Sequence, residues 1–192
     1  MRKLVEATLV SLDGVVGSPE EWALTYWDEE NTEYAHAQLA GVDAFLLGRV
    51  TYEKFAAAWS QVTGDPYLDT INRLPKFVAS ASLRETTWNA TPVTGDVAAE
   101  VTRLKNQSGK TIMKYGTGQL DGTLISHGLI DEFHFSIFPL TVGRGLRLFE
   151  GIDTSSLALR LTGTKTFANG VVQLTYVPRY GSGNPDHPHW NE

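Results

Sequence analysis

The sequence predicts an α/β fold: a mostly parallel central sheet with helices on both faces and an antiparallel hairpin at its C-terminal end. Two observations lead to this prediction. Apolar segments of strand length alternate with segments of helical periodicity through the first two thirds of the chain. Two runs of alternating polarity then flank Asn169-Gly170, a pair typical of hairpin turns. Parallel strands need crossover helices, and these cover both faces of a sheet.

In the first half of the chain, strands and helices follow one another with recognisable boundaries. Asp28 and Thr51 can each cap a helix, and Pro66 is tolerated in a first helical turn. We expect strands at Leu4–Leu12, Ala44–Gly48 and Lys76–Ser80, and helices from Asp28 to Leu39, from Thr51 through Trp59 and from Pro66 to Leu74.

The second half continues the alternation and ends in the hairpin. We expect a short strand at Glu85–Trp88, a helix capped by Asp96, a strand at Thr111–Tyr115, a helix at Gln119–His127, a strand at Glu132–Pro139, and a hairpin that begins near Leu157 and returns through Val171–Pro178. Gly181–Glu192 offers little surface to bury, so it is expected to be a flexible tail beyond a domain of residues 1–180.

Bulk composition narrows the class of protein. With 192 residues, of which 42% are hydrophobic and 20% charged, the chain is expected to be one soluble domain. Its formal net charge of −6 argues against a broad nucleic-acid surface. The absence of cysteine excludes disulfides and thiolate catalysis and is compatible with a cytoplasmic location. We find no apolar run long enough for a membrane span and no metal-ligand spacing, so neither a membrane nor a metal partner is expected.

The most informative stretch is Gly116-Thr117-Gly118, which joins the strand Thr111–Tyr115 to the helix beginning at Gln119. The first N–H groups of a helix are unpaired, its dipole favours negative charge there, and glycine allows a ligand to approach closely. A phosphate or diphosphate fits such a junction and suggests a nucleotide cofactor. A plain strand–helix connection is the alternative. Lys114 and Tyr115 either border the ligand or are ordinary strand residues.

A second junction, Gly48-Arg49-Val50-Thr51, presents an arginine where a phosphate could be bound bidentately. A solvated or ion-paired Arg49 is the alternative. The strand that ends at Ser80 supplies a third element, with the hydroxyl groups of Ser80 and Ser82 at its end.

Taken in order, these three elements resemble the dihydrofolate-reductase superfamily. The chain is most similar to the reductase domain of the bacterial riboflavin-biosynthesis deaminase–reductase and its stand-alone relatives. Further matching segments are Ser11–Gly14, Gly48–Glu53, His127–Glu132 and Pro139–Gly145, and the resemblance covers roughly Lys3 to Pro178. It implies a three-layer dihydrofolate-reductase-like fold, NADPH as cofactor and a homodimer. Apolar residues on both faces of the strands Phe133–Phe138 and Val171–Tyr176 also favour a dimer.

The resemblance also assigns cofactor roles to the junction residues. It places Arg49 and Thr51, next to Gly48, at the cofactor phosphates, Ser80 and Ser82 at the adenosine end, and Gly116, Thr117, Gly118 and Gln119 at the diphosphate. An NAD-selective Rossmann site would carry an acidic residue about 20 positions after a Gly-x-Gly-x-x-Gly turn. This chain lacks that pattern, so NADPH is expected in preference to NADH.

The substrate side is less defined. The resemblance implies a substrate-contacting carboxylate at Asp13, and a simple turn residue is the alternative. Trp22, Trp27 and Phe55 could stack on a flat heterocycle or pack in the core. In dihydrofolate reductases an acidic residue on the first helix binds the pterin, whereas the comparable turn here holds Thr32 and Glu33, with no carboxylate in clear register. This departure counts against dihydrofolate itself as substrate, and no residue is identified as the catalytic acid.

We therefore expect an NADPH-dependent reductase that transfers hydride to a C=N or C=O carbon of a small pterin- or pyrimidine-like heterocycle. One alternative is a non-catalytic nucleotide- or pterin-binding protein on the same fold. Another is a structural or interaction protein that binds no dinucleotide.

Overall fold

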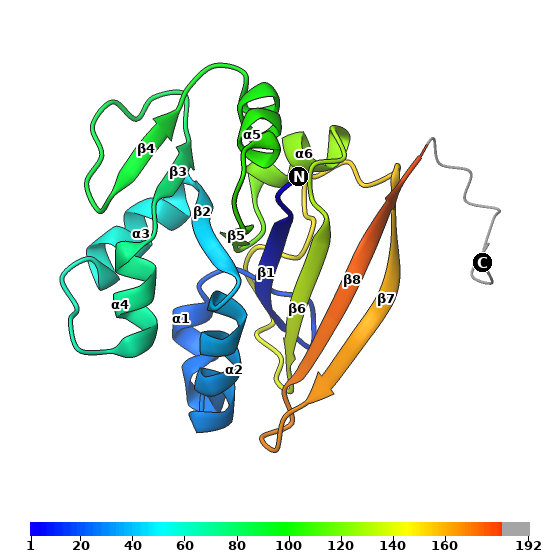
Figure 1. Ribbon diagram of the computed structural model, residues 1–192. Helices are drawn as coiled ribbons and strands as arrows, with labels where there is room; N and C mark the ends of the chain where they lie inside the picture. Colours follow the sequence, from blue (N-terminus) through cyan, green and yellow to red (C-terminus); the bar gives the residue numbers. More distant parts are fainter. Residues whose placement is uncertain (182–192) are drawn as a thin grey trace.

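Eight strands form one sheet in the order β4-β3-β2-β5-β1-β6-β8-β7 in the computed structural model, which describes residues 1–181 (Figure 1). The strands are β1 (Leu4–Ser11), β2 (Val42–Gly48), β3 (Lys76–Ala79), β4 (Ala90–Val93), β5 (Thr111–Tyr115), β6 (Glu132–Phe138), β7 (Leu157–Thr166) and β8 (Val172–Tyr180). Strands β1 to β6 pair in parallel, and β8 runs antiparallel to both β6 and β7. The predicted fold class is therefore confirmed, while the predicted tail, apart from Gly181, lies outside the described residues.

Helices connect the consecutive parallel strands, except β3 and β4, and cover the sheet (Figure 1). They are α1 (Pro19–Trp22), the short 3₁₀ helix η1 (Leu24–Tyr26), α2 (Glu29–Leu39), α3 (Arg49–Trp59), α4 (Pro66–Arg73), α5 (Val97–Asn106) and α6 (Gln119–Ser126). The side chains of Asp28, Asp65 and Asp96 cap α2, α4 and α5 by accepting hydrogen bonds from first-turn N–H groups. None of the helices within residues 1–181 combines the length and apolar character that crossing a bilayer requires.

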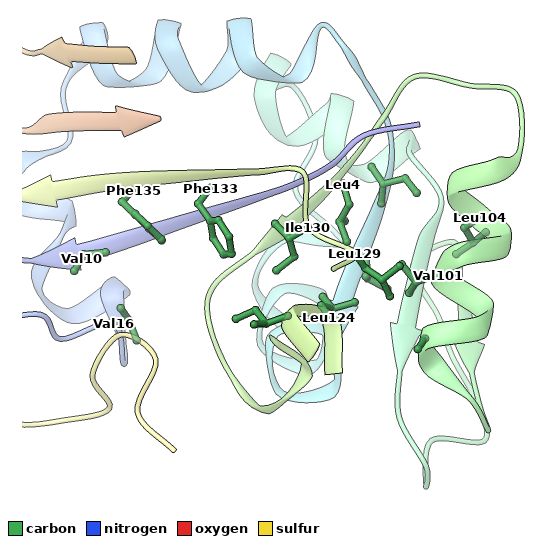
Figure 2. Close-up of a cluster of buried hydrophobic side chains, with 14 residues drawn as sticks. Leu4, Val10, Val16, Val101, Leu104, Leu124, Leu129, Ile130, Phe133 and Phe135 are labelled. Atoms are coloured by element: carbon green, nitrogen blue, oxygen red, sulfur yellow. The ribbon is translucent and has the colours of Figure 1, made fainter. Parts of the chain in front are cut away.

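Alternate residues of the central strands supply two separate cores. Leu4 and Leu46 pack with Val101, Leu104 and Leu124 of α5 and α6, as Figure 2 shows for the labelled side chains. Their sequence neighbours Val5 and Phe45 point to the other face, where they join a cluster that α2, α3 and α4 cover. This alternation follows from the two-residue period of a strand. A third cluster around Trp22 and Phe138 joins α1 to the hairpin.

Two of the expected local features are wrong. Thr51 does not cap α3, because Gly48 is the N-cap residue and Arg49 to Thr51 are already helical. Glu85–Trp88 is not a strand. The next strand is Ala90–Val93, parallel to β3. Trp88 and Asn89 adopt φ angles of 55° and 53°, which interrupt an extended chain just before β4 begins.

The C-terminal hairpin turns where the sequence predicted. Gly170 adopts a φ of +88°, which favours glycine, and Phe167 N–H donates to Val171 O across the turn at 2.9 Å. The Asn169 side chain donates to Tyr26 O at 2.6 Å and to the Asp28 carboxylate at 3.0 Å. The hairpin turn is therefore bound to the start of α2.

Candidate functional site

The three predicted junctions lie next to one another at one edge of the sheet. Strands β3, β2 and β5 are adjacent and parallel, with Gly48 opposite Ala79 and Leu46 opposite Lys114. Their carboxyl ends therefore meet at the same edge, where Ser80, Arg49 and Gly116 follow the three strands. In open α/β sheets this carboxyl edge is where ligands bind.

The N-terminus of α3 is open for an anion. Gly48 has no side chain to cap the helix, and the N–H groups of Val50 and Thr51 donate to no acceptor within residues 1–181. A Cβ atom built on Gly48 would meet no atom within 4 Å, so the glycine faces open space. Unpaired N–H groups and a positive dipole end favour a phosphate at this position.

The Arg49 side chain lies beside this helix end and connects it to the end of β3. Its guanidinium is half-exposed and donates to Glu53 Oε1 at 2.6 Å and to Ser82 Oγ at 2.7 Å. Ser80 Oγ in turn accepts hydrogen bonds from the N–H groups of Ser82 and Leu83 at 3.3 and 3.1 Å. The structure thus brings Arg49, Ser80 and Ser82 together, and it also shows Arg49 in an ion pair.

The glycine turn before α6 lies next to the start of α3. Gly116 adopts a φ of +74°, and a Cβ atom at this position would lie 4.0 Å from Thr51 Oγ1. A Cβ atom on Gly118 would meet no atom within 4 Å, and Gln119 at the first helical position is exposed. Two helix N-termini, both preceded by glycine, therefore adjoin one another, an arrangement that can receive two linked phosphates.

Behind this turn lies a buried charged cluster that the sequence analysis did not identify as a site. It consists of Glu6 on β1, Lys114 on β5 and Asp121 on α6. Lys114 Nζ lies 2.7 Å from Asp121 Oδ1 and 3.3 Å from Glu6 Oε2. Charged residues in strands that are covered on both faces were the available signal, because such residues are rarely buried without a partner.

The cluster shifts the ionisation of its members. Burial, the neighbouring Asp121 carboxylate and its hydrogen bond outweigh the attraction of Lys114 and raise the pKa of Glu6 to about 8. Burial by itself lowers the pKa of Lys114, but the two carboxylates outweigh burial and raise it. The pKa of each group therefore lies above its ordinary value, which favours the protonated form of both Glu6 and Lys114.

Asp13, the predicted substrate carboxylate, is held by internal donors. It accepts hydrogen bonds from Ser11 Oγ at 2.6 Å and from the N–H groups of Val142 and Gly143 at 3.1 and 2.8 Å. These bonds lower the pKa of Asp13 to about 2. Arg147 also donates to its carbonyl oxygen. Asp13 thus fixes the loop that follows β6, and its contact with a substrate stays a prediction.

The structure does not gather the predicted stacking aromatics in one place. Trp22 is buried, lies edge-on to Phe138, and donates from Nε1 to Gly17 O, so core packing accounts for it. Trp27 is 37% exposed and donates from Nε1 to Thr32 Oγ1.

Phe55 lies close to the glycine turn. It stacks on Trp59 with 3.9 Å between ring centroids and meets the ring of Tyr115 edge-on at 6.1 Å. Tyr115 immediately precedes Gly116, and its hydroxyl lies 3.0 Å from that of Tyr67 on α4. Of the predicted aromatics, Phe55 is therefore the one that the fold brings beside the candidate phosphate site.

Comparisons with known proteins place this geometry in context. The RibD C-terminal domain family matches residues 2–173. The uncharacterized protein YyaP of Bacillus subtilis is 30% identical over 202 aligned positions, which cover 99% of this chain and 96% of YyaP.

Solved structures share the fold at lower identity. A putative riboflavin biosynthesis protein from Shewanella sp. PV-4 has a TM-score of 0.74 at 21% identity, covering 92% of this chain and 99% of its own. Dihydrofolate reductase from Enterococcus faecalis, solved with NADP(H) and RAB-propyl, has a TM-score of 0.60 at 15% identity, covering 92% and 96%.

Proposed function

The chain belongs to the RibD C-terminal domain family, and we propose that it is an NADPH-dependent reductase of a small pterin- or pyrimidine-like heterocycle. The observation that carries this proposal is the pairing of two open helix N-termini, those of α3 and α6, beside the half-exposed Arg49 guanidinium. The similar dihydrofolate reductase was solved with NADP(H), which supports a dinucleotide as the ligand of this edge.

The residues present fit such a cofactor. Glycines at positions 48 and 118 leave the space in which phosphates can approach the backbone. In our assignment Thr51 and Gly116 to Gln119 hold the diphosphate, and Arg49, Ser80 and Ser82 hold the 2′-phosphate and the adenosine end. When bound, NADPH supplies the hydride. The protein's own part is to align the two rings and to exclude water from them.

The substrate side is assigned to the residues that border the glycine turn and the loop after β6. Phe55 offers a ring beside Tyr115, and Trp27 is an exposed ring at the start of α2. Asp13 contributes by holding Val142 and Gly143 in place. In this proposal the reacting bond of the substrate is a C=N or C=O group in a flat ring.

Calorimetric titration with NADPH and NADH tests the cofactor, and the loss of NADPH absorbance in the presence of pterins and pyrimidines tests turnover. We expect NADPH to bind more tightly than NADH and to be oxidised with at least one ring class. If neither dinucleotide binds, the reductase proposal is wrong. Binding without oxidation by any pterin or pyrimidine would instead support a non-catalytic nucleotide-binding protein.

We also propose that the protein is a homodimer. Strand β7 forms an edge of the sheet, and its Leu161 is half-exposed. An apolar residue on an open edge strand favours a contact with another chain. Sedimentation equilibrium at micromolar concentration should give twice the mass of one chain, and the mass of a single chain would contradict this proposal.

A further inference from the structure

The buried cluster of Glu6, Lys114 and Asp121 makes one contact with each residue of the glycine turn. Lys114 Nζ donates to the carbonyl oxygen of Gly116. Thr117 Oγ1 donates to Glu6 Oε1 at 2.9 Å. Asp121 Oδ2 accepts the N–H of Gly118 at 2.6 Å.

These contacts come from three different elements. Glu6 and Lys114 are direct register partners on β1 and β5, and Asp121 lies in the first turn of α6. The side chains of Glu6 and Asp121 are fully buried, and that of Lys114 is 3% exposed. The three side chains are therefore shielded from water behind the turn.

Packing alone does not explain such a cluster. Burying charges is unfavourable unless each is paired, and apolar side chains of similar volume often stabilise a core equally well. Charged groups also form directional hydrogen bonds, and each of these bonds fixes the position of one atom of the turn. Gly116 at φ +74° is a conformation that other residues rarely adopt, so the turn benefits from being fixed.

We propose that Glu6, Lys114 and Asp121 are positioning residues that fix Gly116, Thr117 and Gly118 in the shape that receives the cofactor's diphosphate. This inference rests on the proposed function. It has a specific consequence for the N–H groups of the turn. Gly118 N–H is occupied by Asp121, whereas the N–H groups of Thr117, Gln119 and Leu120 donate to no acceptor within residues 1–181. These three N–H groups are therefore the donors available to a phosphate.

The charge of the cluster suits an anionic ligand. The titratable groups that act on Glu6 are Lys114 from β5 and Asp121 from α6, and the two carboxyl groups in turn raise the pKa of Tyr180 on β8. Protonation of Glu6 lowers the negative charge of the cluster by one. Ionisation of Glu6 would add a negative charge behind the phosphate site and weaken cofactor binding.

The chain contains a matched control for this cluster. Lys105 on α5 is equally buried, with its Nζ 2.5 Å from Asp131 Oδ2 and 2.6 Å from Leu129 O. Asp131 also accepts Leu4 N–H, at the amino end of β1, whereas the glycine turn lies at the carboxyl edge. Replacing Lys105 therefore removes a buried lysine from an ion pair with a partly exposed carboxylate, without touching the turn.

The experiment compares Lys114→Met, Asp121→Ala and the control Lys105→Met. NADPH affinity is measured by calorimetry, and hydrogen exchange of the Gly118 amide is measured without ligand. Losing a hydrogen bond to a charged group should weaken NADPH binding about tenfold or more in the first two variants. Lys105→Met should lower the melting temperature but keep NADPH affinity. Equal losses of affinity in Lys105→Met and Lys114→Met would overturn the inference.

The exchange measurement separates this inference from the proposed function. Asp121→Ala, which removes the acceptor of the Gly118 N–H, should speed exchange of the Gly118 amide about tenfold or more, whether or not a dinucleotide binds. If the wild type binds no NADPH, the proposed function fails. If Gly118 exchange is unchanged, the positioning role fails.

Glu6→Gln provides a variant that keeps the shape of the side chain. Wild-type NADPH affinity should fall between pH 7.5 and pH 9 as Glu6 loses its proton, and Glu6→Gln should remove this part of the pH dependence. An identical pH profile in both proteins would contradict the positioning role of Glu6.

Discussion

Arg49 is the residue on which the proposed preference for NADPH depends. Its ion pair with Glu53 joins two side chains that are about half-exposed, and such surface pairs contribute only about 0–1 kcal/mol. A dianionic 2′-phosphate can therefore compete with Glu53 for the guanidinium. Ser82 Oγ, 2.7 Å from Arg49 Nη1, can move with it to the same ligand.

Arg49→Ala should therefore weaken NADPH binding at least about tenfold, because a hydrogen bond to a charged group contributes roughly 1.5–3 kcal/mol. NADH, which lacks the 2′-phosphate, should lose much less. Lys54→Ala is the control, since Lys54 lies on the same helix but pairs with Glu20. Calorimetric titration of both cofactors checks this, and equal losses for NADPH and NADH would mean that Arg49 binds the shared diphosphate.

Asp13→Asn should impair turnover more than cofactor binding. The carboxylate accepts from three internal donors, and an amide offers only one oxygen to them. The loop at Val142 and Gly143 should then lose its fixed position, while α3 and α6 stay unchanged. Steady-state kinetics and NADPH titration of the variant measure the two effects separately. A loss of NADPH affinity with turnover retained would show that Asp13 acts on the cofactor side.

At the scale of elements, local signals predicted most of the fold. Asp28 and Asp96 were recognisable caps, and each begins a helix as expected. The start of α3 was misplaced because glycine is itself an accepted N-cap residue, so Gly48 competes with Thr51. No strand forms at Glu85–Trp88, because Trp88 and Asn89 adopt positive φ angles. Such angles depend on contacts that sequence periodicity does not report.

The residues of the candidate site likewise divide into those that local sequence patterns identify and those that depend on contacts between distant parts of the chain. The strand–glycine–helix junctions are local patterns, so their residues could be identified from the sequence. The buried cluster depends on β1 pairing with β5, which brings Glu6 opposite Lys114 from 108 positions away. No local pattern reports such a pairing. The hydrogen bonds that the N–H groups of Val142 and Gly143 donate to Asp13 also join distant parts of the chain.

One aspartate variant and one threonine variant distinguish a helix cap from a ligand-binding residue. Asp65→Ala removes a carboxylate that accepts from the N–H groups of Tyr67 and Leu68, so it should lower the free energy of unfolding by roughly 1 kcal/mol. Thr51→Ala removes no cap and should change it by less than about 0.5 kcal/mol.

Thr51→Ala should nevertheless weaken NADPH binding, because Thr51 Oγ1 lies beside Gly116. Denaturant unfolding and NADPH titration of both variants provide the measurements. If Thr51→Ala is destabilised but binds NADPH normally, Thr51 is a structural residue and not a ligand-binding one.

At the scale of the whole molecule, strand order brings the site together. Strands β3, β2 and β5 come from distant parts of the chain, yet they are neighbours in the sheet (Figure 1). Each is followed by a polar or glycine residue at the carboxyl edge. The charged cluster lies behind this edge on the face that α5 and α6 cover, so in our proposal folding stability and cofactor binding depend on the same residues.

Stability should therefore depend on pH through Glu6. Its pKa is raised in the folded protein from 4.5 to about 8, so its contribution is complete below pH 4.5 and is lost as pH rises through 8. Relative to Glu6→Gln, the wild type should lose free energy of unfolding between about pH 5 and pH 8. Burial lowers the pKa of Lys76 to about 8, so Lys76 makes the free energy of unfolding rise with pH, but only above that range.

Urea unfolding of the wild type and Glu6→Gln at several pH values checks this expectation. A constant difference in unfolding free energy between the two proteins from pH 5 to pH 8 would mean that Glu6 is not protonated in the fold.

The most direct test of the whole account is a crystal structure of the protein grown with saturating NADPH. We expect density for the diphosphate between the N-termini of α3 and α6, and for the 2′-phosphate beside Arg49 and Ser82. Density for the dinucleotide at any other edge of the sheet, or none at a concentration that saturates binding in solution, would contradict the account.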